Sequence, residues 1–100
     1  MTPYRILVVD DSAFMRKLVS DMIRSDERFT VIGTASNGRE AVDAVMRLRP
    51  DALTMDVEMP VMSGLEALTV IMKEWPTPTV MLSSATYDGA EAAIRSLELG

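Results

Sequence analysis

Short apolar runs alternate with amphipathic segments along this chain of 100 residues. The runs are rich in aliphatic and β-branched side chains with little polar alternation, which is typical of strands buried on both faces of a parallel sheet. They cover residues 4–9, 29–35, 52–55 and 79–82. In the segments that follow them, apolar residues recur every three or four positions, which predicts helices with one buried face. These helical stripes lie within 15–23, 41–48, 65–75 and 90–97.

The repeated order of strand and helix predicts an α/β fold with a doubly wound parallel sheet. Right-handed crossovers place consecutive strands side by side or across a switch point of the sheet. A closed eight-stranded barrel needs roughly 250 residues, so this chain is too short to form one. We therefore expect a single domain over residues 1–100.

Composition narrows the chemistry that this domain can perform. The sequence contains neither cysteine nor histidine, which excludes a disulfide framework, Cys–His or Ser–His catalysis and most zinc sites. Its net charge of −5 argues against nucleic acid or an anionic membrane surface as a direct partner. No apolar run approaches the ~20 residues that span a bilayer, and the first residues do not resemble a signal peptide. We expect a cytoplasmic protein.

Acidic residues follow two of the predicted strands at the point where each strand ends. Asp10 and Asp11 follow the run 6–9, and Asp56 follows the run 52–55. In open parallel sheets, ligands bind at the carboxyl ends of the strands where the strand order reverses, so these three side chains converge if the two strands are neighbours there. Two such charges ~4 Å apart repel by about 4 kcal/mol at an effective dielectric constant near 20. The repulsion is relieved if the pKa of one carboxyl group rises or if a divalent cation binds. A set of oxygen ligands without histidine or cysteine favours Mg²⁺.

A carboxylate beside Mg²⁺ is also a candidate nucleophile toward phosphorus, and the product would be an aspartyl phosphate. Simpler roles compete with this one. The triplet 10–12 at a strand–helix junction is often only a helix cap, and Asp56 alone could be a turn former. Ser83, at the end of the fourth run, could likewise belong to an ordinary turn. The functional interpretation rests on all of these residues lying at one predicted edge of the sheet.

The residues around these carboxylates resemble the receiver domains of two-component response regulators, and the resemblance covers essentially the whole chain. The first motif is Leu-Val-Val-Asp-Asp-Ser at 7–12, and the second is Asp-Val-Glu-Met-Pro-Val-Met-Ser-Gly at 56–64. Further stretches resemble the receivers of chemotaxis protein-glutamate methylesterases; they lie at 10–17, 64–68, 75–78, 81–84 and 97–100. The resemblance implies a flavodoxin-like receiver fold and a role in a chemotaxis phosphorelay.

The resemblance also implies a role for each site residue. Asp56 would accept a phosphoryl group from a sensor histidine kinase or a small phosphodonor. Asp11 and Asp56 would bind Mg²⁺ directly, and Asp10 would bind it mainly through water. The backbone carbonyl of Glu58 would complete the metal site, and Ser83 would be the switch hydroxyl that turns toward the phosphoryl oxygens. The acidic side chain of Glu58 would lie near the entry to the site and modulate the lifetime of the phosphoryl group.

Receivers of this family continue beyond the Leu-Gly of residues 99–100 into a fifth strand, a catalytic lysine and a fifth helix. We therefore expect a receiver that is truncated before the fifth strand, with four strand–helix units. The lysine has no counterpart here, since Lys17 and Lys73 fall on predicted helices away from the strand ends. In the resembled proteins, the receiver regulates a C-terminal methylesterase domain. That hydrolase site is absent from this chain, which leaves assisted self-phosphorylation of Asp56 as its own chemistry.

Two other interpretations remain open from the sequence. A truncated or engineered half-domain would leave the strand at 79–82 uncovered and would self-associate through the uncapped sheet without signalling. A phosphatase with an aspartyl intermediate would be expected to carry a second aspartate two residues after the nucleophile, where this chain has Glu58.

Overall fold

The computed structural model describes residues 2–82. In this part of the chain the elements are β1 (Tyr4–Val9), α1 (Ala13–Arg24), β2 (Phe29–Ala35), α2 (Gly38–Leu48), β3 (Ala52–Asp56), α3 (Gly64–Glu74) and β4 (Thr79–Leu82). The strands begin and end where the apolar runs predict, except that β3 includes Asp56. The predicted helix within 90–97 and the switch candidate Ser83 lie outside the described residues.

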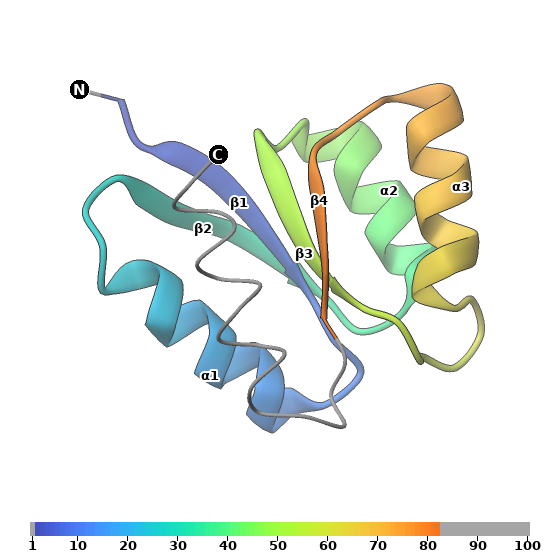
Figure 1. The fold of residues 1–100 in the computed structure, drawn as a ribbon, viewed down its shortest axis with the longest axis horizontal. Helices are drawn as coiled ribbons and strands as arrows, with labels where there is room; N and C mark the ends of the chain where they lie inside the picture. Colours follow the sequence, from blue (N-terminus) through green and yellow to red (C-terminus); the bar gives the residue numbers. More distant parts are fainter. Residues whose placement is uncertain (1, 83–100) are drawn as a thin grey trace.

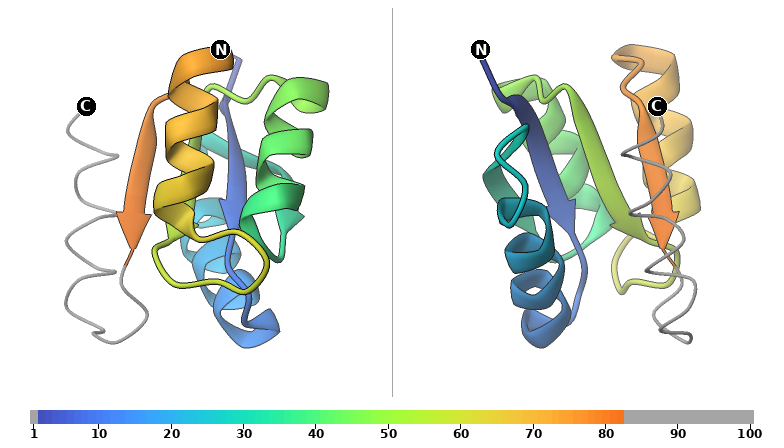
Figure 2. Two further views of the ribbon diagram at one scale, coloured as in Figure 1. Left: turned by 90° about the vertical axis from the view of Figure 1, so that its right-hand side faces the viewer. Right: turned by 60° about the vertical axis from the view of Figure 1, so that its left-hand side comes forward.

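The four described strands form one parallel sheet in the order β2-β1-β3-β4. The chain runs from β1 outward to β2 and then returns to the other side of β1, so the strand order reverses between β1 and β3. Helix α1 covers one face of the sheet, and α2 and α3 cover the other (Figure 1, Figure 2). The prediction of a doubly wound parallel α/β sheet is confirmed. β4 forms one edge of the described sheet, and self-association there stays a prediction.

Successive residues of β1 point to opposite faces of the sheet and enter two separate cores. Ile6 and Val8 lie in a cluster with apolar residues of α1, whereas Leu7 and Val9 lie in a larger cluster with residues of α2 and α3. Each of these four side chains is at most 1% exposed. Full burial of such a side chain contributes roughly 1.5–3 kcal/mol. The strand that precedes the acidic pair is therefore held firmly from both sides.

Each described helix begins with a side chain that accepts a hydrogen bond from the first helical turn. Ser12, Asn37 and Ser63 occupy the N-cap positions, and each accepts from the backbone amide three residues later. At α3, the side chain of Glu66 also accepts from the amide of Ser63, which completes a capping box. The cap predicted at the triplet 10–12 is therefore present, and Ser12 is the residue that provides it.

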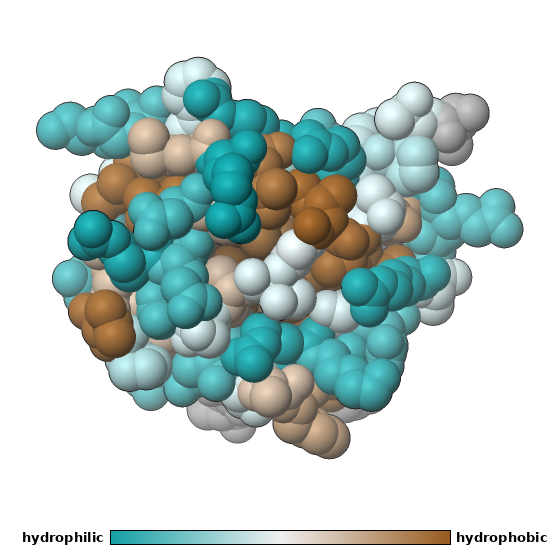
Figure 3. All heavy atoms as spheres, turned by 180° about the vertical axis from the view of Figure 1, so that it is seen from behind, coloured by the Kyte–Doolittle hydropathy of each residue, from teal (hydrophilic) through white to brown (hydrophobic). Residues whose placement is uncertain are grey.

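The surface mixes apolar and hydrophilic side chains. On the face opposite to that of Figure 1, apolar atoms lie between hydrophilic ones (Figure 3). Val61 in the loop after β3 is 84% exposed, and Phe14 in the first turn of α1 is 75% exposed. Both lie at the end of the sheet where β1 and β3 end. Among residues 2–82, no helix has the length and apolar character needed to cross a bilayer.

Candidate functional site

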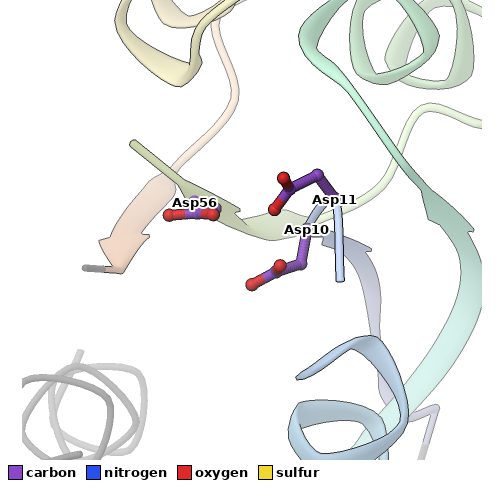
Figure 4. A group of neighbouring side chains, drawn as sticks. All are labelled: Asp10, Asp11 and Asp56. Carbon is purple, nitrogen blue, oxygen red and sulfur yellow. The ribbon is translucent and has the colours of Figure 1, made fainter. Parts of the chain in front are cut away.

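Three carboxylates gather at the edge of the sheet where the strand order reverses (Figure 4). Val9 of β1 pairs with Met55 of β3, so Asp10 and Asp56 follow side by side. One carboxylate oxygen from each of Asp10, Asp11 and Asp56 lies within 4.8 Å of the other two. The structure thus brings together the three acidic side chains that the strand ends identify in the sequence.

The cluster is largely withdrawn from solvent. Asp10 is 2% exposed and Asp56 is 1% exposed, whereas Asp11 is exposed. Burial raises the pKa of Asp10, and the negative charges of Asp56 and Asp11 raise it further, against the opposing effect of the hydrogen bond from the Ser12 amide. A bound cation would offset both the repulsion and the lost hydration. The electrostatics of the cluster therefore favour a metal ion.

Hydrogen bonds hold Asp10 in place at the end of β1. Its amide donates to the carbonyl of Ala35 in β2 over 3.0 Å, and its Oδ1 accepts from the amide of Ser12 over 2.9 Å. Oδ1 therefore stabilises the loop after β1, and Oδ2 can bind a metal or a metal-bound water. The Oδ1 of Asp56 accepts from the amide of Glu58 over a longer distance of 3.4 Å.

The loop from β3 to α3 is anchored at two close backbone approaches. The amide of Gly64 donates to the carbonyl of Val57 over 2.9 Å, and the amide of Gly38, at the start of α2, donates to the carbonyl of Met62 over 2.9 Å. A Cβ atom at either glycine would collide with backbone, namely the carbonyl of Asp56 for Gly64 and the carbonyl of Met62 for Gly38. The loop that carries the predicted metal-binding carbonyl is therefore held against the N-terminus of α2.

Between these anchors, Val61 adopts a left-handed backbone conformation with a φ of 69°. A β-branched residue is rarely found there, and such a conformation costs on the order of 1–3 kcal/mol. The amide of Met62 donates to the carbonyl of Pro60 over 2.7 Å and closes a tight turn around Val61. Strained residues persist where the surrounding structure holds them, and here Gly38 and Gly64 do so.

Sequence reasoning also predicted one further metal ligand, the carbonyl of Glu58, and excluded Lys17 and Lys73 from the site. Glu58 is exposed in the loop two residues after Asp56, and its role as a carbonyl ligand stays a prediction. Lys17 is an exposed residue of α1 that pairs with Asp21 over 3.0 Å, and Lys73 lies in the last turn of α3. Both lysines belong to helices, as the sequence predicts, and neither lies in β3 or in the loop after β1, which carry the carboxylates.

Three residues that shape the site, Arg16, Gly38 and Gly64, were given no role by the reasoning from sequence patterns, although Arg16 and Gly64 lie in the stretches that carry the resemblance. The guanidinium of Arg16, in α1, donates to the carbonyl of Asp10 over 2.8 Å. An arginine on a helix is a weak signal, because most such residues only cover the surface. The two glycines offered a stronger signal. Each stands at the first position of a helix directly after an Asn or Ser cap, where a residue with better helix propensity would be expected.

Comparison with known proteins decides the family. The profile of the response regulator receiver domain matches residues 6–100. The chain belongs to the response regulator receiver domains. It is 56% identical over 96 residues to the protein-glutamate methylesterase/protein-glutamine glutaminase of Pyrococcus abyssi, which is 96% of this chain and 26% of that protein. It is 55% identical over 100 residues to the protein of the same name from Geobacillus kaustophilus, which is 100% of this chain and 29% of that protein. The receiver thus spans about a quarter of the length of these curated relatives.

Solved receiver structures share this fold. The response regulator domain of Thermotoga maritima CheB matches with a TM-score of 0.81 at 48% identity, over 97% of this chain and 72% of that chain. A chain of the R. sphaeroides complex between CheY6 and the P1 domain of CheA3 matches with a TM-score of 0.74 at 37% identity, over 100% of this chain and 78% of that chain. The resemblance noted in the sequence is confirmed: this is a flavodoxin-like receiver domain of a CheB-like chemotaxis response regulator.

Proposed function

We propose that this receiver is a Mg²⁺-dependent phosphoacceptor switch in which Asp56 takes up a phosphoryl group. The observation that carries the proposal is the cluster of Asp10, Asp11 and Asp56, with two of its carboxylates buried at the reversal point of the sheet. Aspartyl phosphorylation with Mg²⁺ is typical of the family to which the chain belongs.

The residues of the cluster fit Mg²⁺. They supply hard carboxylate oxygens, and the sequence has no histidine or cysteine to recruit a softer metal. Mg²⁺ binds oxygen at 2.0–2.1 Å, so two of its ligands are at most about 4.2 Å apart. The three carboxylates, already within 4.8 Å of one another, need to move little to meet this condition. We assign direct contacts to Asp11, Asp56 and the carbonyl of Glu58, and a contact mainly through water to Asp10, one oxygen of which already accepts from the amide of Ser12.

Asp56 is the proposed nucleophile because it ends β3 inside the cluster and is 1% exposed. Its carboxylate oxygen attacks the phosphorus of the donor, the bond from phosphorus to the leaving group breaks, and the leaving group departs with that electron pair. Bound Mg²⁺ supplies neutralisation of the charge on the phosphoryl oxygens. Burial of Asp56 limits the access of water to the acyl phosphate. Ser83 is the proposed switch hydroxyl, and the side chain of Glu58 is proposed to tune the lifetime of the phosphoryl group.

We infer that a sensor histidine kinase supplies the phosphoryl group and that the receiver regulates a methylesterase domain. The two curated relatives are named protein-glutamate methylesterase/protein-glutamine glutaminase, and the matched region is about a quarter of each. The R. sphaeroides structure contains a receiver protein, CheY6, with the P1 domain of CheA3. Any hydrolase activity would belong to the output domain and not to the carboxylate cluster.

The test of this function is phosphate incorporation from a small acyl phosphate, followed by intact-protein mass spectrometry. With Mg²⁺ present, we expect the chain to gain the mass of one phosphoryl group, and with a chelator instead of Mg²⁺ we expect no gain. Hydroxylamine should remove the added group, because it cleaves acyl phosphates. A chain that is folded by circular dichroism and gains no mass in the presence of Mg²⁺ would contradict the proposal.

Asp10→Asn should stabilise the metal-free domain at neutral pH and reduce its stabilisation by Mg²⁺. The pKa of Asp10 is raised, mainly by burial, so the folded state binds this proton more tightly than the unfolded state. The contribution of Asp10 to the free energy of unfolding is fully present below its ordinary pKa of 3.8. It is lost as the pH rises through the higher pKa that Asp10 has in the folded state. The amide of the variant can still accept from Ser12 but carries no charge. Urea unfolding at acidic and neutral pH, with and without Mg²⁺, measures both effects.

Asp43→Asn is the matched control for this substitution. Asp43 lies on α2 with a side chain that is 68% exposed, so its neutralisation should change neither the pH dependence nor the response to Mg²⁺. An Asp10→Asn variant that is less stable than the wild type at neutral pH without Mg²⁺ would argue against a destabilising buried charge in the cluster.

A further inference from the structure

Arg16 links α1 to the end of β1. Its Nη1 donates to the carbonyl oxygen of Asp10 over 2.8 Å, and the residue is half-buried. The next residue, Lys17, is exposed, and its Nζ forms an ion pair with Oδ2 of Asp21 over 3.0 Å. Two neighbouring cations on one helix therefore differ in their contacts. Arg16 reaches the loop of the proposed metal site, and Lys17 pairs along the helix surface.

The carbonyl that Arg16 binds belongs to the peptide between Asp10 and Asp11. The plane of this peptide fixes the direction of the bond from the Asp11 amide nitrogen to its Cα, and so helps to set the direction in which the side chain of Asp11 leaves the backbone. Asp10 itself makes two further hydrogen bonds: its amide donates to the carbonyl of Ala35, and its Oδ1 accepts from the amide of Ser12. The arginine therefore completes a set of hydrogen bonds that orients two of the three carboxylates.

The electrostatic surroundings of Arg16 include a carboxylate from the next helix along the chain. The carboxylate of Glu40 on α2 lies in the field of Arg16: hydrogen bonds from Ser36 are the main cause of the lowered pKa of Glu40, and the positive charge of Arg16 also contributes. The Oε1 of Glu40 accepts from the amide of Ser36 over 3.0 Å and from its hydroxyl over 2.9 Å. The arginine therefore lies within electrostatic range of a carboxylate that the loop after β2 holds in place.

We propose that Arg16 is a positioning residue that holds the peptide between Asp10 and Asp11 in the orientation required for Mg²⁺ binding. The inference rests on the proposed function, because it assumes that the cluster binds Mg²⁺. Removal of the arginine has two opposite effects. Loss of its positive charge alone favours a bound cation. Loss of its hydrogen bond frees the peptide, and the loss of partners that orient metal ligands weakens metal binding by roughly 10–100-fold. The sign of the change in affinity distinguishes the two effects.

Isothermal titration calorimetry with Mg²⁺ provides the test on four chains: wild type, Arg16→Met, Arg16→Lys and Lys17→Met. The two methionine variants each lose one positive charge at adjacent positions of α1 and keep an aliphatic stem for packing. We expect Arg16→Met to bind Mg²⁺ about tenfold more weakly. We expect Lys17→Met to bind as the wild type does or slightly more tightly. Arg16→Lys, whose ammonium can still donate to the carbonyl of Asp10, should regain most of the lost affinity.

Urea unfolding without Mg²⁺ verifies that each variant is folded. If Arg16→Met does not fold, Arg16→Gln replaces it, because its side chain is neutral and shorter than that of arginine. A neutral variant at position 16 that binds Mg²⁺ as tightly as Lys17→Met would overturn the inference and leave the proposed function intact. A wild-type chain that binds no Mg²⁺ would overturn both.

Discussion

Asp56→Asn is expected to abolish phosphoryl uptake, even at Mg²⁺ concentrations that saturate the wild-type chain. A carboxamide is a poor nucleophile toward phosphorus, so no acyl phosphate can form at this position. Asp56 is 1% exposed and lies beside two other carboxylates. A neutral side chain of almost the same shape removes a buried negative charge, so the variant should be at least as stable as the wild type without Mg²⁺. Intact-protein mass spectrometry of the folded variant then reports lost chemistry and not lost structure.

A Mg²⁺ titration separates the nucleophile from a metal ligand. Asp11→Asn keeps Asp56 and loses one proposed ligand, so its uptake should fall and then recover as the Mg²⁺ concentration is raised. Asp56→Asn should not recover at any Mg²⁺ concentration, and Asp43→Asn, at an exposed position of α2, should behave as the wild type. Uptake by Asp56→Asn that peptide mapping places on Asp11, the exposed member of the cluster, would contradict the assignment of the nucleophile.

The position of the acidic cluster could be predicted because it depends on two properties that the sequence displays. Asp10 directly follows the apolar strand β1, and Asp56 is the last residue of the apolar strand β3. Parallel strands on either side of a reversal point end at the same edge of the sheet. The pairing of Val9 with Met55 realises this arrangement, so the apolar pattern predicts both the fold and the convergence of the carboxylates.

The contacts within the loops could not be predicted, because they depend on where backbone and side chains meet in space. The capping and the metal-binding interpretations of the triplet 10–12 compete in the sequence, yet they are compatible in the structure. Ser12 caps α1, while Asp10 accepts from the amide of Ser12 and still faces the cluster. The left-handed conformation of Val61 runs against the preference of a β-branched residue, so only the anchored loop explains it. The bond from Arg16 to Asp10 likewise requires the actual path of α1 beside the strand end.

Gly64→Ala is expected to destabilise the fold by about 3 kcal/mol, the upper end of the usual cost of overpacking. A Cβ atom at Gly64 would overlap the carbonyl oxygen of Asp56 and would lie 3.0 Å from its carbonyl carbon and 2.9 Å from Cε of Met81. Backbone atoms cannot rotate away, so α3 would have to shift from the end of β3. The backbone conformation is not the cause, because no glycine among residues 2–82 has a positive φ. Urea unfolding measures the loss against a total stability of roughly 5–15 kcal/mol for a domain.

Gly33→Ala is the matched control, because both substitutions reduce the conformational entropy of the unfolded chain in the same way. A Cβ atom at Gly33 would meet the ends of two flexible side chains, Cδ1 of Leu48 at 3.1 Å and Cδ1 of Leu7 at 3.7 Å, so a change of less than about 1 kcal/mol is expected. The obstacle at Gly64 is the peptide of Asp56 itself, so Gly64→Ala should also slow phosphoryl uptake in the molecules that remain folded, whereas Gly33→Ala should not. Equal stability of the two variants would mean that α3 can move away from β3 at little cost, and that close backbone approach does not fix the position of the phosphoacceptor.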